Sequence, residues 1–138
     1  MGDISGKCSL VIKGNDYLDF KSIDNNIGMM PSKKYKKGGA FSTLAPNAIP
    51  RDIWIYDSNI GQDGNVNMAL DVLLDKLKGS KNFIRDLSIT SDICIRCFVQ
   101  SDLAQIGFDL SPYVINGLTN LNVRVEISIL SWGQVEMD

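Results

Sequence analysis

The feature that most constrains the fold of this chain is a stripe of leucines in its middle. Apolar residues recur between positions 66 and 77 at i, i+4, i+7, i+8 and i+11, which is the spacing of one helical face. Charged residues fall on the other side, and Gly79 marks the expected end of the helix. Leucines at this spacing are typical of a core, so the segment predicts a helix packed on a second layer. The stripe consists of Val66, Leu70, Leu73, Leu74 and Leu77.

The second layer is expected to be a sheet, because apolar and polar residues alternate elsewhere in the chain. The clearest alternation covers residues 123–129 and predicts a strand with one buried face and one solvated face. Residues 104–110 alternate in the same way and predict another strand. Further strands are predicted at 8–13, 52–57 and 92–99. Together these segments predict a mainly antiparallel sheet of about five strands.

Capping residues predict two further helices. Asp19 is placed to cap a short helix that ends at Gly28, and Ser111 followed by Pro112 is a typical helix start for residues 111–121. The expected fold is therefore α+β, with two or three helices packed on one face of the sheet. A length of 138 residues matches one domain, 1–138, with residues 1–7 and 131–138 frayed.

The chain contains no histidine, which narrows its possible chemistry. Histidine is the side chain that most readily transfers protons near neutral pH, so Ser-His and Cys-His nucleophile pairs and most catalytic zinc sites are excluded. Carboxylate chemistry stays possible at Asp57, Asp102 and Asp109, although acids at strand ends commonly cap or face water. We therefore predict no catalytic residues and a protein that is not an enzyme.

The three cysteines, Cys8, Cys94 and Cys97, form no disulfide framework. Cys94 and Cys97 have CxxC spacing, but residues three apart on a strand point to opposite faces and cannot share a metal ion. No second pair completes a set of four ligands. We expect buried, reduced thiols, and we expect neither a metal nor a cofactor.

Residues 63–67 place oxygen-bearing side chains at alternate positions, as calcium-binding loops do. An EF-hand loop that began at Asp63 would need glycine at position 68 and glutamate at position 74. Met68 and Leu74 stand there instead. We interpret the segment as a turn followed by an asparagine helix cap.

Residues 32–39 are expected to form a basic, flexible loop. Lysines next to glycines can bind a phosphate or another anion, but the P-loop and dinucleotide spacings are absent. Lysine-rich surface loops are also commonly just solvated. The candidate anion-binding residues are Lys33, Lys34, Lys36, Lys37, Gly38 and Gly39.

Charge is spread unevenly along the chain. Residues 1–50 carry a net charge of +3 and residues 51–138 a net charge of −5, which together give the formal −2. An acidic second half disfavours nucleic acid and suits a basic protein partner, although surplus acid is also an ordinary solubility feature. Aromatic residues can join such a surface or pack in the core, and Trp132 shares this ambiguity. The candidate partner-binding residues are Asp57, Asp63, Asp102, Asp109, Trp54 and Tyr56.

We expect no secretory signal in this chain. Its first seven residues hold no apolar segment, and no apolar run approaches the ~18 residues of a membrane span. Gly6 stands where N-myristoylation needs serine or threonine. We expect a cytoplasmic protein that makes no membrane contact.

Several short motifs, taken in order, resemble a bacterial family known as domain of unknown function 4279. They are Leu-Val-Ile-Lys-Gly-Asn-Asp at 10–16, Ile-Gly-Met-Met-Pro-Ser at 27–32, Lys-Lys-Gly at 36–38, the strand around Trp54, the helix 66–77 and Phe-Asp-Leu-Ser-Pro at 108–112. The resemblance spans roughly residues 8–130 and departs from the family pattern at Ile27, where leucine is typical. It implies a small cytoplasmic bacterial protein and transfers no catalytic residue, and some members look like toxin-immunity partners.

Two functional hypotheses follow. The first is a non-catalytic protein-binding module, specifically an immunity-type protein that neutralises a basic toxin through its acidic second half. The alternative is a small-ligand binding or sensing domain that closes the 33–39 loop over an anion or nucleotide. A histidine-free enzyme that uses paired carboxylates is a third, weaker possibility.

Overall fold

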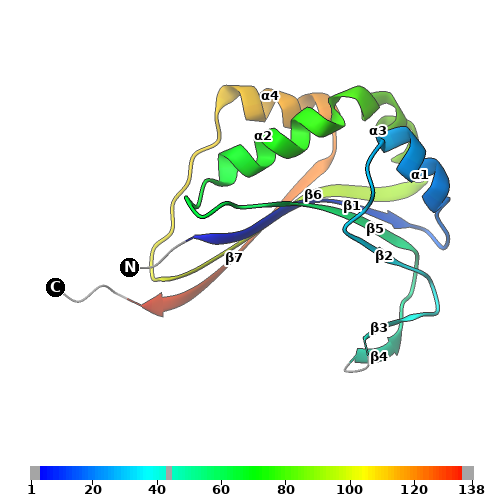
Figure 1. The fold of residues 1–138 in the computed structure, drawn as a ribbon, viewed down its shortest axis with the longest axis horizontal. Helices are drawn as coiled ribbons and strands as arrows, with labels where there is room; N and C mark the ends of the chain where they lie inside the picture. Colours follow the sequence, from blue (N-terminus) through cyan, green and yellow to red (C-terminus); the bar gives the residue numbers. More distant parts are fainter. Residues whose placement is uncertain (1–3, 43–44, 135–138) are drawn as a thin grey trace.

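Five strands form one sheet, and the α-helices all lie on the same face of it (Figure 1). The computed structural model describes residues 4–42 and 45–134. The strand order is β2-β5-β1-β6-β7, with β1 antiparallel to both β5 and β6, β2 antiparallel to β5, and β7 parallel to β6. The expected α+β fold with a mainly antiparallel sheet is confirmed. The strands are β1 (Ser5–Gly14), β2 (Lys33–Tyr35), β5 (Ile53–Asn59), β6 (Ser91–Leu103) and β7 (Arg124–Gln134).

The helices begin at the caps that the sequence predicts. The side chains of Asp19, Asn65 and Ser111 each accept a hydrogen bond from the backbone N–H three residues later, at 2.9–3.2 Å. Gly28 ends the first helix in the left-handed conformation, with φ of 76°. The helices are α1 (Phe20–Ile27), α2 (Val66–Leu77), α3 (Lys81–Leu87) and α4 (Pro112–Leu121), with a 3₁₀ turn, η1 (Lys78–Ser80), between α2 and α3. No helix in the described ranges combines the length and the apolar character that crossing a membrane requires.

The main core lies between α2 and the central strands. The predicted leucine stripe is buried, with Leu70, Leu73 and Leu77 at most 1 % exposed. These side chains belong to the same buried cluster as Leu10 of β1 and Ile95 of β6. The stripe therefore fixes the helical layer on the sheet, as its spacing predicts.

A smaller cluster lies on the opposite face of the sheet. Two short strands, β3 (Ala40–Ser42) and β4 (Ala45–Ala48), pair with each other and project away from the helices (Figure 1). Ile49, just after β4, is buried with Val11, Ile53 and Cys94. This end of the second face is therefore covered, whereas the part of that face nearer β7 carries charged side chains of β6 and β7 together with Phe98 and Leu130.

Residues 104–110 do not form the predicted strand. Ile106, Phe108 and Leu110 are partly buried and pack on the core, whereas the residues between them are exposed. The alternation is real, but the segment is a crossing between the sheet and α4 (yellow in Figure 1) and pairs with no strand among the described residues. The alternation of apolar residues predicts a strand, but a strand also requires a ladder of backbone hydrogen bonds with a neighbour, and alternation alone does not provide it.

Other expectations also need correction. The sequence predicts that the helix ends at Gly79 and gives no signal for α3. In the structure η1 leads directly into α3, and Ile84 of α3 is fully buried. Residues 5–7 belong to β1 and residues 131–134 to β7, so the chain is not frayed there. The remaining positions expected to fray, 1–3 and 135–138, lie outside the described residues.

Candidate functional site: an acidic groove

Two adjoining hollows lie where β5 ends and α2 begins. The first, of about 490 Å³, runs along the start of α2 and is lined by Tyr56 and Asp57, among others. The second, of about 600 Å³, lies between the turn before α2 and residues 107–111, and it includes Asp109. Asp63 and Asn65 line both hollows, so the two form one surface. We call this surface the acidic groove.

Asp63 and Asp109 supply the exposed negative charge of the groove, and Lys76 adds one exposed positive charge at the first hollow. The turn before α2 is closed by a 2.9 Å backbone hydrogen bond from Gly64 to Gly61, and Asp63 Oδ1 accepts from the Asn65 N–H at 3.2 Å. This arrangement confirms the turn-and-cap interpretation of residues 63–67. Asp109 is exposed on the crossing segment and makes no ion pair within the described parts of the chain. Both carboxylates are therefore available to a cationic partner.

The crossing segment is held beside α2 by one polar contact. The Ser111 N–H donates to the side-chain oxygen of Asn67, in the first turn of α2, at 2.8 Å. Ser111 also caps α4, so the same residue fixes the end of the segment and the start of the helix. The contact brings Asp109 and Asp63 to one groove although they are far apart in the sequence.

Asp57 is held inside the protein rather than presented to solvent. Its Oδ1 accepts from Ser9 Oγ at 2.6 Å, its Oδ2 lies 3.4 Å from Lys7 Nζ, and its side chain is 13 % exposed. Lys7 therefore offsets its charge. Asp57 is among the residues that line the groove, but its side chain pairs with Ser9 and Lys7 on the face of the sheet away from α2, so it adds little negative potential to the groove.

Tyr56 forms the aromatic wall of the first hollow. Lys76 Nζ donates to its hydroxyl at 2.6 Å and lies 5.2 Å from its ring centre. Tyr56 is partly buried against the core, so its hydroxyl end is the part that faces the groove. This geometry combines an apolar ring with a polar tip, as is common at protein interfaces.

Trp54 is wrongly assigned to a partner surface, because it is completely buried. It lies on the helix-facing side of β5, is 0 % exposed, and its Nε1 donates to Asp24 Oδ1 at 2.9 Å. Asp102 also lies outside the groove. Its residue is half-buried near the end of β6, and its Oδ1 is buried without a hydrogen-bond partner among the described residues.

The predicted basic loop is not a flexible anion cradle. Lys33 and Lys34 are in β2, and their pairing with Ile55 and Trp54 directs them to opposite faces. Lys34 lies 3.7 Å from Asp24, and Lys37 Nζ donates to Asp16 at 2.7 Å. That hydrogen bond lowers the pKa of Asp16 and raises the pKa of Lys37. Two of the four lysines are thus occupied within the fold, which argues against a shared ligand.

The glycines of that segment belong to a paired backbone. Gly38 N–H donates to the Ile49 carbonyl, and the Ile49 N–H donates to the Gly39 carbonyl, at 2.8 and 2.7 Å. The Lys37 N–H donates to the buried carboxylate of Asp52 at 2.7 Å, and the Leu18 N–H donates to its other oxygen at 2.8 Å. These backbone donors are consumed internally, so they do not form an anion site.

The cysteines are buried, and the structure pairs two of them in a way that the sequence did not predict. Cys94 lies in the small cluster on the second face and Cys97 in the main core, so their opposite orientation is confirmed. Cys8 is opposite Cys97 across β1 and β6. A hydrogen bond between these two thiols raises the pKa of Cys8 and lowers that of Cys97, and burial raises the Cys8 pKa further. In the described residues no three Cys, Asp or Glu side chains gather closely enough to hold a metal ion.

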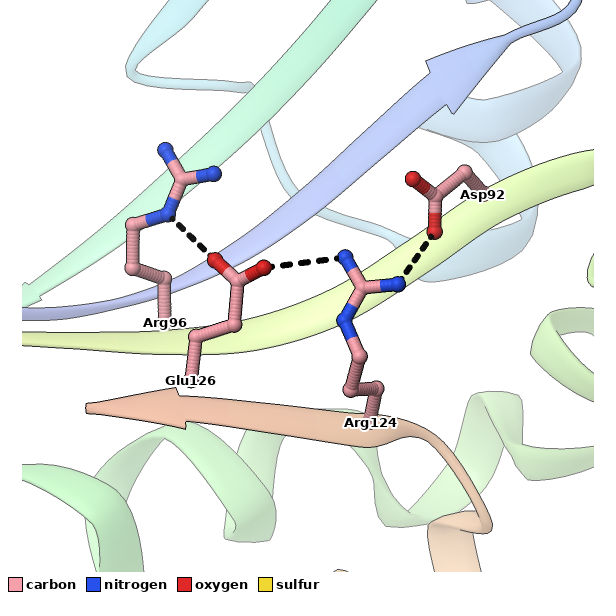
Figure 2. A network of polar contacts seen from close by, with 4 residues as sticks. All are labelled: Asp92, Arg96, Arg124 and Glu126. Atoms are coloured by element: carbon pink, nitrogen blue, oxygen red, sulfur yellow. Dashed lines mark hydrogen bonds and ion pairs between the residues drawn. The ribbon is translucent and has the colours of Figure 1, made fainter.

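A row of charged side chains crosses the second face of the sheet, and the sequence analysis missed it. Arg96 Nε donates to Glu126 at 3.1 Å, and Arg124 donates to both Glu126 and Asp92, each at 3.1 Å (Figure 2). The hydrogen bond from Arg96 is the main reason that the pKa of Glu126 is lowered. The polar positions of strand 123–129 signalled a solvated face, but only the parallel register with β6 brings these charges together.

Comparison with family models matches residues 4–132 to the family described as Domain of unknown function (DUF4279). The chain belongs to this DUF4279 family. The match confirms the resemblance found in the sequence and includes both sides of the acidic groove. Comparison with curated proteins and with solved structures finds no match.

Proposed function

We propose that this DUF4279 protein is a non-catalytic protein-binding module that docks a basic partner in the acidic groove. The observation that carries the proposal is the convergence of Asp63 and Asp109 on one exposed surface from separate segments. Neither carboxylate is in an ion pair within the described ranges, so both can pair with lysine or arginine of a partner. Tyr56 adds an aromatic wall beside them.

We infer further that the partner is a toxin and that this chain acts as a cytoplasmic immunity-type protein. An inhibitor of this kind works by covering a basic active surface, which requires complementary charge and no turnover. The acidic second half of the chain and its lack of histidine both support such a role. Opposite charge would speed the encounter with the toxin, so the association rate should depend strongly on salt.

The test uses a double variant, Asp63→Asn with Asp109→Asn, and Asp86→Asn as its matched control. Asp86 is an exposed acid on α3, outside the groove. Asparagine at position 63 keeps an oxygen that can accept from the Asn65 N–H, so the turn is preserved. The native chain is used to isolate a partner from its own host, and that partner is then purified alone. Association rates are measured at about 50 mM and about 500 mM salt.

At low salt the double variant is expected to associate about tenfold more slowly, whereas the control associates like the native chain. The difference should shrink at high salt because screening weakens charge steering. For the immunity role, the partner expressed alone should stop growth and this chain should restore it. Isolation of no partner, or of one that binds the double variant equally well, would overturn the proposal.

A second candidate function is supported by a different cavity. A pocket of about 460 Å³ lies between α2 and α4, with Leu74 and Leu121 at its apolar surface and Lys78 and Lys81 among its lining. Lys78 is paired at 2.9 Å with Asp75, which also lines the pocket, so Lys81 is the cation that an anionic ligand would contact above the apolar floor. We propose this pocket as the location for the ligand-binding alternative. Thermal shift with nucleotides and phosphorylated metabolites tests it. No stabilisation by any of them, or equal stabilisation of the Lys81→Gln variant, would reject it.

A further inference from the structure

The outer half of β7 is an uncovered sheet edge. Only β6 pairs with β7 in the described sheet, so no strand of that sheet lies along the other side of β7. Side chains of this half are exposed on both faces of the sheet. Ile127 is 48 % exposed, Ile129 54 %, Leu130 46 % and Trp132 57 %. No other strand of the described sheet exposes so many large apolar side chains.

Up to residue 130 this edge lacks the usual protection against pairing, because the register shift of β7 against β6 comes later, between Ser131 and Gln134. Natural edge strands carry charged residues, proline or strong bulges in the exposed stretch. Residues 127–132 contain neither a charge nor a proline, and the charges of β7 are confined to its first half, at Arg124 and Glu126. Such a strand is built to accept another strand.

We propose that the occupant is a second copy of this chain, paired antiparallel through β7 about a two-fold axis at Ser128. A two-fold contact requires a surface that complements itself. In this register Ile127 lies opposite the partner's Ile129, and the same pair repeats on the other side of the axis. The four isoleucines form one apolar patch on the helix side of the joined sheet, because Ile127 and Ile129 are opposite the core residues Cys97 and Val99 of β6.

The second face is complementary in the same register. In this register Arg124 lies opposite the partner's Trp132. Regular pairing of β7 with β6 extends from Arg124 to Ser131, and Ser131 is on the helix side, so alternation places Arg124 and the next residue, Trp132, on the face away from the helices. Asp92 and Glu126 hold the Arg124 guanidinium in place (Figure 2), so the partner's indole ring can stack on this planar cation. Glu126 lies opposite the partner's Leu130, so no like charges face each other.

A neighbouring register is poorer. Moving the axis by one residue, to Ile129, places Glu126 opposite the partner's Trp132 and removes the cation–π pair. It also places Ile127 opposite the partner's Ser131, which breaks up the isoleucine patch. An axis at Ser128 gives favourable contacts on both faces of the joined sheet. The interface formed there does not include the acidic groove.

Cysteine cross-linking tests the register. In the proposed dimer, residue 128 lies opposite itself, within the ~4.4–6.8 Å Cα separation of a disulfide. Ser128→Cys should therefore form a covalent dimer under copper–phenanthroline oxidation. Leu130→Cys is the matched control, because two such residues would be about 13 Å apart along the strand direction alone. The native cysteines are at most 2 % exposed and do not interfere. Cross-linking of the Leu130 variant but not of the Ser128 variant would overturn the register.

Sedimentation of the full chain tests the dimer itself. Native protein should change from monomer to dimer as its concentration rises through the micromolar range. Ile129→Lys should weaken dimerisation at least thirtyfold, because it places a charge within the isoleucine patch. Ile89→Lys, at a site 81 % exposed before β6, should leave dimerisation unchanged. Circular dichroism confirms that both variants are folded. A native chain that stays monomeric at about 100 µM, or equal effects of both variants, would overturn the proposal.

Discussion

The Trp54→Phe variant tests whether Trp54 belongs to the core. The sequence suggests that Trp54 binds a partner, whereas the structure buries it completely. The indole is 0 % exposed, and its Nε1 donates to Asp24 of α1 at 2.9 Å. Asp24 also lies 3.7 Å from Lys34 of β2, so one carboxylate joins β5, α1 and β2. A residue in this position contributes to stability and cannot touch a partner.

The expected cost follows from these contacts. Phenylalanine keeps most of the apolar contact but leaves a void, for about 1 kcal/mol, and the lost hydrogen bond to a charged acceptor adds about 1–2 kcal/mol. Asp24 keeps Lys34 and is 19 % exposed, so it is not left unsolvated. The free energy of unfolding should fall by about 2–3 kcal/mol, and by about 3–5 kcal/mol or more for Trp54→Ala. For a chain of this length, Trp54→Phe should lower Tm by roughly 6–12 °C.

Urea unfolding followed by far-UV circular dichroism measures this change. Trp132→Phe makes the same chemical change at a side chain that is 57 % exposed, and it should alter the free energy of unfolding by less than about 0.5 kcal/mol. Both variants are measured at one low protein concentration, so that dimerisation does not enter the comparison. A Trp54→Phe protein as stable as the Trp132→Phe protein would refute the burial of Trp54 and return it to the list of partner-binding residues.

Three further predictions concern β1, Glu126 and the cysteines. Gly6→Ala should lower the urea midpoint far more than Gly28→Ala, because a Cβ at Gly6 would lie 1.9 Å from the Phe98 carbonyl oxygen. A Cβ at Gly28 would meet open space, so that variant has only the cost of about 1–2 kcal/mol for a positive φ. Equal midpoints for the two variants would contradict this packing. Glu126 has a lowered pKa, so its stabilising effect is complete above its ordinary value of 4.5 and is lost as pH falls through the lower folded value. Tm of Glu126→Gln should therefore fall less steeply than that of the native chain below about pH 5, and parallel curves would show that the ion pairs do not form in solution. Native protein should not react with a thiol reagent at Cys8, Cys94 or Cys97, because each of these residues is at most 2 % exposed. Mass spectrometry measures the labelling, and rapid labelling of any of the three would contradict their burial.

Much of the fold was predictable because its signals are local. The leucine stripe of α2 and the caps Asp19, Asn65 and Ser111 depend on residues within one or two helical turns. Such short-range signals survive in a single sequence. The errors arose where tertiary contacts decide. Residues 104–110 alternate like a strand because their inward side chains pack on the core, yet nothing local shows that no neighbouring strand is present.

The candidate site was only partly predictable for the same reason. The sequence indicates Asp63 and Asp109 as partner-binding residues because they belong to the acidic second half of the chain. The structure places both in one groove. Asp57 was selected on the same ground, but its pairing with Ser9 and Lys7 depends on the β1–β5 register. The prediction of an anion site at residues 33–39 is wrong for a similar reason. Strand pairing directs Lys33 and Lys34 to opposite faces, and acids from other segments pair with Lys34 and Lys37. Charge is visible in a sequence, whereas the partner that offsets it is not.

Strand order explains how the two proposed surfaces can act together. The acidic groove is built beside β5 and α2, whereas the uncovered edge is β7, and β1 and β6 separate β5 from β7 in the sheet. Neighbouring strands are about 4.8 Å apart, so β5 and β7 are roughly 14 Å apart within the sheet. Pairing through β7 extends the sheet outward, away from β5. A dimer joined at Ser128 would therefore carry one groove on each outer side, and each groove would remain open to its own partner.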